Sequence, residues 1–296
     1  MLCPVCSHNQ YSKILTVKDF TVSAENFEVV ECASCGFRFT AHPPAPDQIG
    51  RYYQSDAYIS HTDSKKGIFN TIYQLIRKQA VASKRKLVTH FSNCSTGQLL
   101  DYGCGTGAFL MEMKSAGWQV QGMEPDPGAA SRAAELTSST ISHPDQLSSL
   151  PGNAFNVVTM WHVLEHVHDL HGTLDQVQRI LKQDGMLIVA VPNHTSFDAR
   201  HYAENWAAYD VPRHLYHFSP SSMKYLLKSN GFKLANLKPM WFDSYYVSLL
   251  SEKYKQTGLL GVVRAFLIGC ISNLLALNTN AKASSIIYEI KKIKED

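Results

Sequence analysis

The chain has 296 residues, of which 45% are hydrophobic, so it can fill the core of one large domain or of one ordinary domain with appendages. A formal net charge of +3 is too small for a general polyanion-binding surface, so composition offers no argument for a nucleic-acid partner. The first ten residues lack the charged start and the long apolar stretch of a secretory signal, and we therefore expect the chain to stay in the cytoplasm.

Residues 1–45 contain two Cys-x-x-Cys pairs: Cys3 and Cys6 in "CPVC", and Cys32 and Cys35 in "CASCG". In a reducing compartment this spacing favours a metal over a disulfide, and four thiolates close a tetrahedral zinc site. Because such a site has no open coordination position, we predict a structural zinc rather than a catalytic one. A redox role would need a thioredoxin-like context, which is missing. The segment therefore predicts a small module that resembles a zinc ribbon.

Residues 46–92 are interpreted as a connector followed by one long helix. The connector holds "RYYQSDAY", whose Tyr53 and Tyr58 are candidates to cover a cationic cofactor with their aromatic faces. After it, "IFNTIYQLIRKQAVASKRKLVTHF" has apolar residues at helical spacing with basic residues between them. This pattern predicts one amphipathic helix.

From residue 93 to residue 296, short apolar runs alternate with helical stretches. We predict strands in "QLLDYG", "WQVQGMEP", "FNVVTMWHVL", "GMLIVAVPN", "FKLANLKPMWF" and "SSIIYEIKKI". Alternation of this kind indicates an α/β fold with a mainly parallel sheet and helices on both faces.

The stretch "LLDYGCGTGAFL" places Gly103, Gly105 and Gly107 directly after the first of these strands. A glycine-rich turn between a strand and a helix lets the backbone approach a ligand closely. The next strand ends in Glu124, where a carboxylate can accept both hydroxyls of a ribose. The spacing differs from the Gly-x-Gly-x-x-Gly of dinucleotide sites, and Asp101 before the first glycine suits a cationic ligand better than a pyrophosphate.

Over residues 95–240 the chain resembles the class I S-adenosylmethionine (SAM)-dependent methyltransferases, through "LLDYGCGTGAFL", "VQGMEPD", "FNVVTMWHVLEHVHD" and "GMLIVAVPN". The resemblance implies a Rossmann-like, seven-stranded, mainly parallel sheet. It also implies that the three glycines lie beneath the methionine part of SAM, that Asp101 anchors this turn and the ammonium side, and that Glu124 holds the ribose. Asp145 in "HPDQL", after the third strand, falls where such enzymes contact the adenine amino group. Some sugar methyltransferases also carry a zinc-binding module ahead of a class I domain.

Candidate catalytic residues follow the fourth strand. A hydroxyl acceptor must lose a proton, and we consider His162, Glu165 and His166 in "WHVLEHVHD", and His217 in "DVPRHLYHF", as groups that could take it. Alternatively, Glu165 and His166 cap and orient the following helix. "HVLEH" also matches an inverted zinc peptidase motif, but that motif needs a helix where a strand is predicted. A divalent metal that polarises an acceptor oxygen is a further alternative.

The segment after the fifth strand, "ENWAAYDVPRHLYHF", is expected to close the acceptor pocket. Its aromatic and basic residues can stack on, or hydrogen-bond to, a ring-shaped or anionic acceptor; the alternative is a lid packed for its own stability. The residues concerned are Trp206, Tyr209, Arg213, His214 and His217.

The most apolar stretch, "GLLGVVRAFLIGCISNLLALN" at 258–278, is predicted to be part of a helical insertion at about 243–280 in the last crossover of the sheet. Arg264 lies inside it and a strand follows it, so we do not expect it to span a membrane. A stripe of small residues predicts close helix packing, and the bulky stripe opposite is left for a partner subunit, a membrane surface or an apolar part of the acceptor. The alternative is a buried helix of the same domain. The small stripe consists of Gly258, Gly261, Ala265, Gly269, Ser272 and Ala276.

Together these features predict a SAM-dependent methyltransferase with a structural zinc, acting on a small or lipid-linked acceptor such as a saccharide. We place it in the cytoplasm, with peripheral contact at the inner face of the membrane or a homodimer through residues 258–278 as the partners to test. The alternative is a protein whose ribbon binds RNA and whose cofactor domain senses or modifies it. Salt-sensitive RNA retention distinguishes the two.

Overall fold

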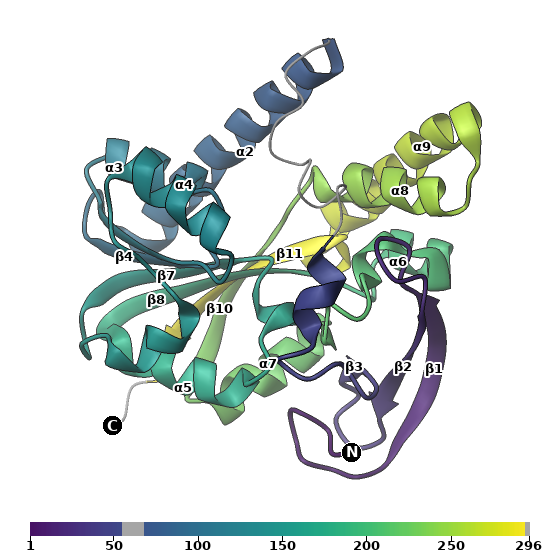
Figure 1. The fold of residues 1–296 in the computed structure, drawn as a ribbon, viewed down its shortest axis with the longest axis horizontal. Coiled ribbons are helices and arrows are strands. Elements are labelled where there is room, and N and C mark those ends of the chain that lie inside the picture. Colours follow the sequence, from purple (N-terminus) through teal and green to yellow (C-terminus); the bar gives the residue numbers. More distant parts are fainter. Residues whose placement is uncertain (55–67, 294–296) are drawn as a thin grey trace.

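The computed structural model of the chain describes residues 1–54 and 68–293, with the backbone alone for residues 68–78. Two β-sheets lie side by side, and the N-terminal one packs beside the lower part of the larger one (Figure 1). The larger sheet has seven strands in the order β10-β11-β8-β7-β4-β5-β6. Its strands are β4 (Gln98–Tyr102), β5 (Gln119–Met123), β6 (Ile141–Ser142), β7 (Phe155–Trp161), β8 (Leu181–Pro192), β10 (Phe232–Pro239) and β11 (Ser285–Lys292).

Strand β11 runs in the opposite direction to the other six strands of this sheet, because it pairs antiparallel with both β8 and β10 while the remaining pairs are parallel. The predicted Rossmann-like, mainly parallel sheet is therefore confirmed. All six strands that the sequence patterns predicted are present. The very short β6 completes the seven.

Helices cover both faces of the sheet (Figure 1). One face carries α2, α3 and α4, and the other carries α5 and α7. The α-helices are α2 (Ile68–Ser92), α3 (Ala108–Ser115), α4 (Pro127–Thr137), α5 (Leu170–Ile180), α6 (Phe197–Tyr202), α7 (Pro220–Ser229), α8 (Asp243–Tyr254) and α9 (Gly258–Asn278). Short 3₁₀ turns are η1 (Ile49–Tyr53), η3 (Pro144–Ser149), η4 (Leu164–His166), η5 (Ala203–Asn205), η6 (Ala207–Tyr209) and η7 (Asn280–Lys282).

Local sequence signals account for the helix boundaries on the α5 and α7 face. Helix α5 buries Leu170, Leu174 and Val177, whose spacing places them on one face toward the sheet. Helix α7 begins as its sequence predicts, because the Ser219 hydroxyl accepts from the backbone N–H of Ser222 and the two residues form a capping box.

The N-terminal module is built from β1 (Tyr11–Lys18), β2 (Asn26–Cys32) and β3 (Arg38–Thr40), and its sheet is completed by β9 (Tyr216–His217) from the larger domain. The Phe37 ring packs against Tyr216 and Phe218 in the core that also holds α5 and α7. The opposite side of the module packs Val17 and Val29 against residues of α6 and the 3₁₀ turns that follow it. The module therefore shares its hydrophobic core with the larger domain and is not a separately folded unit.

A buried ion-pair network joins the module to the larger domain. The Arg213 guanidinium is 1% exposed, and its Nη2 donates to Asp19 at 2.9 Å and to Asp210 at 2.6 Å. Its Nη1 donates to the Tyr52 carbonyl at 2.7 Å. The two carboxylates compensate the charge that burial would otherwise leave unpaired, so this arginine holds three chain segments together.

The helical insertion predicted near 243–280 is confirmed: α8 and α9 form a hairpin between β10 and β11. Five members of the predicted small-residue stripe are buried, namely Gly261, Ala265, Gly269, Ser272 and Ala276. The sixth, Gly258, is exposed at the first position of the helix, so its place in the stripe was predicted wrongly. Gly258 is the first residue of α9, so no helical turn precedes it to continue the face that packs against α6 and α8.

Candidate functional site

The glycine-rich turn after β4 has the left-handed backbone that its composition predicts. Gly103, Gly105 and Gly107 have φ angles of 80°, 54° and 81°. The backbone N–H groups of Gly103 and Cys104 both donate to the Met123 carbonyl, at 2.7 and 2.9 Å, and this ties the turn to the end of β5.

The three glycines meet different surroundings. A Cβ at Gly107 would lie 2.9 Å from Ala133 Cα, so this glycine lets α3 pack closely against α4. A Cβ at Gly105 would meet no described atom within 4 Å. Gly105 is therefore the position at which the turn presents bare backbone to open space, as a ligand-binding turn requires.

Glu124, at the end of β5, is held by the same turn. Its Oε2 accepts from the Gly105 backbone N–H at 2.8 Å and its Oε1 accepts from the Asp126 N–H at 3.0 Å. Burial raises the pKa of Glu124, and these two hydrogen bonds act in the opposite direction. A carboxylate oxygen keeps a second lone pair, so Glu124 can still accept from a sugar hydroxyl.

Asp101 is buried beneath the turn, where its Oδ1 accepts from the Thr159 hydroxyl at 2.7 Å. Burial raises the pKa of Asp101 to about 7, although the Thr159 hydrogen bond and the charge of Lys84 both lower it. The Lys84 ammonium, from α2, lies 4.5 Å from the centre of the Trp161 ring. The local sequence pattern predicted the acid, whereas Thr159 and Lys84 were missed because they come from other elements.

The remaining predicted cofactor contacts have mixed outcomes. Asp145 stands in the first turn of η3, with its side chain 89% exposed and 3.1 Å from His143 Nδ1. Tyr53 is placed beside His166, with its hydroxyl 3.0 Å from His166 Nδ1. Tyr58 lies outside the described residues. Contact of these side chains with a cofactor stays a prediction.

The parallel pairing of β4 with β7 brings the glycine turn next to the histidine-rich segment. The register aligns Asp101 with Thr159, so both strands end at the same edge of the sheet. A Cβ at Gly103 would fall 2.4 Å from Val163 Cγ2, which shows how closely the turn approaches the loop after β7. The two predicted halves of the site are therefore direct neighbours.

His162 is held between two carboxylates. Its Nε2 lies 3.0 Å from Asp243 Oδ2 and its Nδ1 lies 3.4 Å from Glu165 Oε1. Burial alone would lower the pKa of His162, but the hydrogen bonds and charges of Asp243 and Glu165 outweigh it and raise the pKa to about 10. His162 therefore carries a positive charge at neutral pH and has no free lone pair with which to take up a proton.

This ion pair predicts a pH-dependent loss of stability in the Asp243→Asn variant. The stability from the raised His162 pKa is fully present below its usual value of 6.5 and is lost as the pH rises through about 10. The lowered pKa of Asp243 makes its own contribution disappear as the pH falls below about 3.8. Urea unfolding should thus give the largest difference between parent and variant near pH 5 to 6, as an order-of-magnitude window from these values. The exposed Asp175→Asn is the control; a pH-independent difference for Asp243→Asn would contradict the pairing.

Glu165, His166 and His214 form a compact group next to His162. Their ligand-type atoms all lie within 4.8 Å of one another. Glu165 is fully buried, and apart from the His162 ion pair its two carboxylate oxygens accept no hydrogen bond from a described residue. Burial and the nearby His214 lower the pKa of His166 to about 4, so His166 is neutral at pH 7. Such a donor set can take up a proton or hold a divalent cation.

Two alternative interpretations of this segment are wrong. Glu165 and His166 do not cap α5, because the Asp169 carboxylate does so by accepting from the Gly172 N–H at 2.9 Å. The zinc peptidase motif also fails, since His162 follows strand β7 and Glu165 and His166 lie in the 3₁₀ turn η4, so no helix carries all three groups.

His217 is not brought into this group. It lies in β9, is 3% exposed, and its Nε2 is 3.2 Å from the Thr40 hydroxyl of the N-terminal module. Arg213 and Trp206 are likewise buried in structural contacts, Trp206 by donating to Asp198 at 2.8 Å. Of the two interpretations of this segment, the lid packed for its own stability agrees better with the structure.

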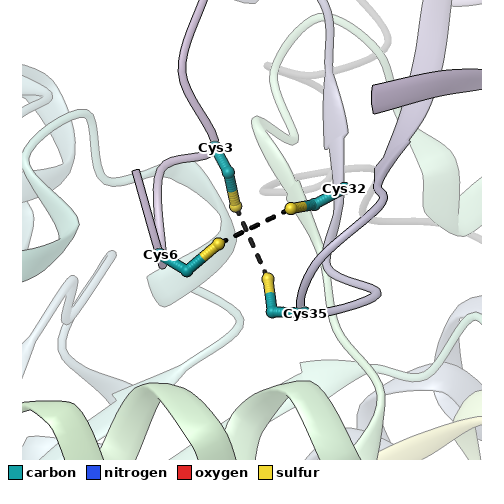
Figure 2. Close-up of side chains that lie close together, drawn as sticks. All are labelled: Cys3, Cys6, Cys32 and Cys35. Atoms are coloured by element: carbon teal, nitrogen blue, oxygen red, sulfur yellow. Dashed lines mark hydrogen bonds between the residues drawn. The ribbon is translucent and has the colours of Figure 1, made fainter. Parts of the chain in front are cut away.

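The four predicted zinc ligands converge in the N-terminal module (Figure 2). The Sγ atoms of Cys3 and Cys35 are 3.6 Å apart, those of Cys6 and Cys32 are 3.5 Å apart, and all four lie within 4.8 Å of one another. A tetrahedron with Zn–S bonds of about 2.3 Å places its sulfurs about 3.8 Å apart. The geometry therefore fits a structural zinc ion, which would supply a rigid cross-link between the two knuckles.

Comparison with known proteins identifies the larger domain as a methyltransferase domain. The family described as "Methyltransferase domain" matches residues 73–237, which is more than half of the chain and leaves the N-terminal module outside. A ubiquinone biosynthesis O-methyltransferase from Azorhizobium caulinodans is 26% identical over 176 residues, covering 53% of this chain and 70% of that protein. One from a Bradyrhizobium species is 31% identical over 114 residues, covering 34% of this chain and 42% of that protein.

Solved structures share the fold at low sequence identity. Magnesium protoporphyrin IX methyltransferase from Synechocystis PCC 6803, with bound SAH, has a TM-score of 0.54 and 15% identity, covering 82% of this chain and 98% of that chain. A SAM-dependent methyltransferase from Archaeoglobus fulgidus has a TM-score of 0.50 and 21% identity, covering 76% of this chain and 100% of that chain.

Proposed function

This chain belongs to the methyltransferase-domain family and is a SAM-dependent methyltransferase; from that premise we propose that it methylates an oxygen atom of a small acceptor with an apolar or lipid-linked portion. The observation that carries the proposal is the contact between the glycine turn and the loop after β7. It sets a cofactor-binding turn directly beside a buried acid and a neutral histidine.

The residues present fit SAM. We assign the bare backbone at Gly105 to the methionine part and Glu124 to the ribose hydroxyls. Asp101 would face the cationic end, where a positive ligand favours its carboxylate form. When bound, SAM supplies an electrophilic methyl group on a sulfonium sulfur. The protein then has to align the acceptor with that group and keep water out.

His166 is the group we assign to the acceptor proton. A proton on Nδ1 donates to the Arg213 carbonyl at 3.0 Å, which leaves the Nε2 lone pair to accept. When the acceptor oxygen takes the methyl group that SAM would supply, His166 Nε2 would take up the proton that the hydroxyl loses. The adjacent Glu165 carboxylate stabilises the imidazolium that forms.

Charged His162 has a different role in this proposal. Its side chain is one-third exposed, and both of its N–H groups face the carboxylates of Asp243 and Glu165, so its charge can stabilise a negative acceptor oxygen but it cannot deprotonate the acceptor. Asp243 acts through His162 as a positioning residue. We place it with the site because it is the first residue of α8, which reaches the edge of the sheet from the helical insertion.

The choice of oxygen and of an apolar acceptor rests on the base and on the surroundings. Methylation of a hydroxyl requires removal of a proton, and a neutral imidazole is present for it. The curated relatives above are named as O-methyltransferases of ubiquinone biosynthesis. The exposed apolar helix α9 follows directly on α8. A saccharide or an RNA acceptor draws no comparable support from the described residues.

The decisive experiment joins calorimetric titration with SAM and its demethylated product to a screen of methyl acceptors. The screen compares phenols with and without an alkyl chain, glycosides and primary amines. We expect His166→Gln to lower kcat by about 100-fold, as loss of a general base does, with the SAM Kd unchanged. His90→Gln, an exposed histidine of α2, is the matched control and should leave kcat unchanged.

Three outcomes would overturn parts of this assignment. Equal kcat for His166→Gln and the parent removes His166 as the base. Methylation of amines alone removes the oxygen acceptor. Activity that disappears after metal depletion and returns with Mg²⁺ would instead assign Glu165, His166 and His214 to a bound cation.

A further inference from the structure

Helix α9 exposes an unusually apolar face. Leu259 and Leu260 are 89% and 77% exposed, and seven further large apolar side chains of the helix are at least 40% exposed. These are Val262, Val263, Phe266, Leu267, Ile271, Leu274 and Leu277. A soluble surface seldom gathers so many apolar side chains in one place, and such a patch indicates a contact with something outside the chain.

The face is presented rigidly by the helix behind it. The Ser272 hydroxyl donates to the buried Asp198 carboxylate at 2.6 Å, and Asn273 Nδ2 donates to the Trp241 carbonyl at 2.9 Å. At Gly269 the backbone approaches α8 so closely that a Cβ would lie 2.6 Å from the Tyr245 ring. The small-residue side of α9 is therefore packed against the rest of the protein, and the helix cannot rotate to bury its bulky side.

Exposed aromatic side chains flank this face at the start of α8. Trp241, Phe242 and Tyr246 are 39%, 50% and 46% exposed. Tryptophan and tyrosine are enriched at the boundary between lipid and water, because each has an apolar ring and a polar atom. We treat these side chains and the exposed side of α9 as one apolar patch, carried by the α8–α9 hairpin that projects away from the seven-stranded sheet (Figure 1). We refer to it as the apolar arm.

The exposed charges of the arm all have one sign. Over residues 240–282 there are four basic residues, and all four are exposed: Lys253, Lys255, Arg264 and Lys282. The two acids are occupied: Asp243 pairs with His162, and Glu252 is 2% exposed and lies 3.6 Å from Arg264. An exposed apolar helix in a segment whose exposed charges are all basic complements a negatively charged lipid surface.

Length and hydropathy would let α9 cross a bilayer, since it has 21 residues and an 18-residue stretch of it has a mean hydropathy of 2.0. However, the small-residue side is packed against α6 and α8, and strand β11 of the central sheet begins seven residues after the helix ends. A helix tied to the fold at both ends can lie in the plane of the interface but cannot traverse it.

We propose that the apolar arm binds this protein to the surface of an anionic lipid bilayer, with α9 lying in the plane of the headgroups. This inference goes beyond methyl transfer and does not depend on it. Since α8 begins at Asp243, which contacts His162, a seated arm also brings the candidate site near the lipid surface.

The test is co-sedimentation of the full chain with two kinds of vesicle: phosphatidylcholine alone, and phosphatidylcholine with about a third phosphatidylglycerol. We expect binding to the anionic vesicles that weakens with added salt. The variant Leu260→Gln/Leu267→Gln/Leu274→Gln should lower partitioning by at least about 100-fold, because all three side chains are exposed and their apolar area is what inserts. The control is Leu136→Gln, a half-exposed leucine of α4.

A second variant tests the charges. Lys253→Gln/Lys255→Gln should lower partitioning to anionic vesicles by about 30-fold, since each basic side chain near a negative surface contributes roughly fivefold. Unchanged thermal melting and SAM affinity establish that both variants fold.

The proposal is overturned if the parent binds neither vesicle, or if it resists alkaline extraction as a spanning protein does. It is also overturned if the arm makes the parent dimeric without lipid and the leucine variant is monomeric, because the occupant is then a second copy of this chain.

Discussion

Removal of zinc from the four-cysteine site is expected to lower the Tm of the whole chain by about 10 °C or more, rather than to melt the N-terminal module alone. The ion closes the two knuckles, and structural zinc sites carry an apparent binding free energy on the order of 10 kcal/mol. The loss should spread, because β9 of the larger domain completes the module's sheet and Phe37 packs in the same core as α5 and α7.

Metal analysis and calorimetry check this result. The purified parent should hold one zinc per chain, and Cys32→Ser should hold none and melt like the chelated parent. Cys94→Ser is the matched control, because Cys94 is half-buried and lies outside the group of four. A chelated protein that keeps the parent Tm, or a purified parent without zinc, would contradict the prediction of a structural zinc ion.

Replacement of Gly105 by valine is expected to abolish SAM binding, with a loss of affinity of at least about 1000-fold. The new side chain would project into the open space that the turn presents, where we place the cofactor. The positive φ of 54° also adds backbone strain of roughly 1–2 kcal/mol. Backbone strain by itself would lower the Tm of the variant but would not prevent SAM from binding.

A matched variant separates the two effects. Gly258 has φ 65° and nothing within 4 Å of a Cβ, but it begins α9 on the helical insertion. Gly258→Val should therefore lower the Tm about as much as Gly105→Val and leave SAM affinity intact in calorimetric titration. Equal affinity for Gly105→Val and the parent would show that the turn does not hold the cofactor.

The site was predictable where its residues are close in sequence. The glycine turn, Asp101 and the two cysteine pairs each lie within a few residues of one another, so a short pattern carries both the residue types and the geometry they need. The alternation of apolar runs and helical stretches likewise predicted the sheet and both of its covered faces. The small-residue stripe of α9 was correct in five of its six positions for the same reason.

The site was not predictable where it depends on residues far apart. Asp243 lies 3.0 Å from His162 only because α8 begins at the edge of the sheet where β7 ends, and this pairing turns a candidate base into a charged group that cannot take up a proton. Arg213 and Asp19 are 194 residues apart and form a buried ion pair, so an expected acceptor contact is a structural one. A sequence pattern states what a side chain can do, but not which partner will reach it.

The sequence by itself therefore determined the fold class, the left-handed glycine turn and the grouping of the four cysteines, because each arises from local periodicity or short spacing. Only the tertiary structure decided which histidine is neutral, which carries a charge and which is buried in the seam with the N-terminal module. It also decided that the bulky side of α9 faces outward, because the small side is already bonded to Asp198 and packed on α8. Burial and charge are properties of the assembled surroundings, and these exist only once the chain has folded.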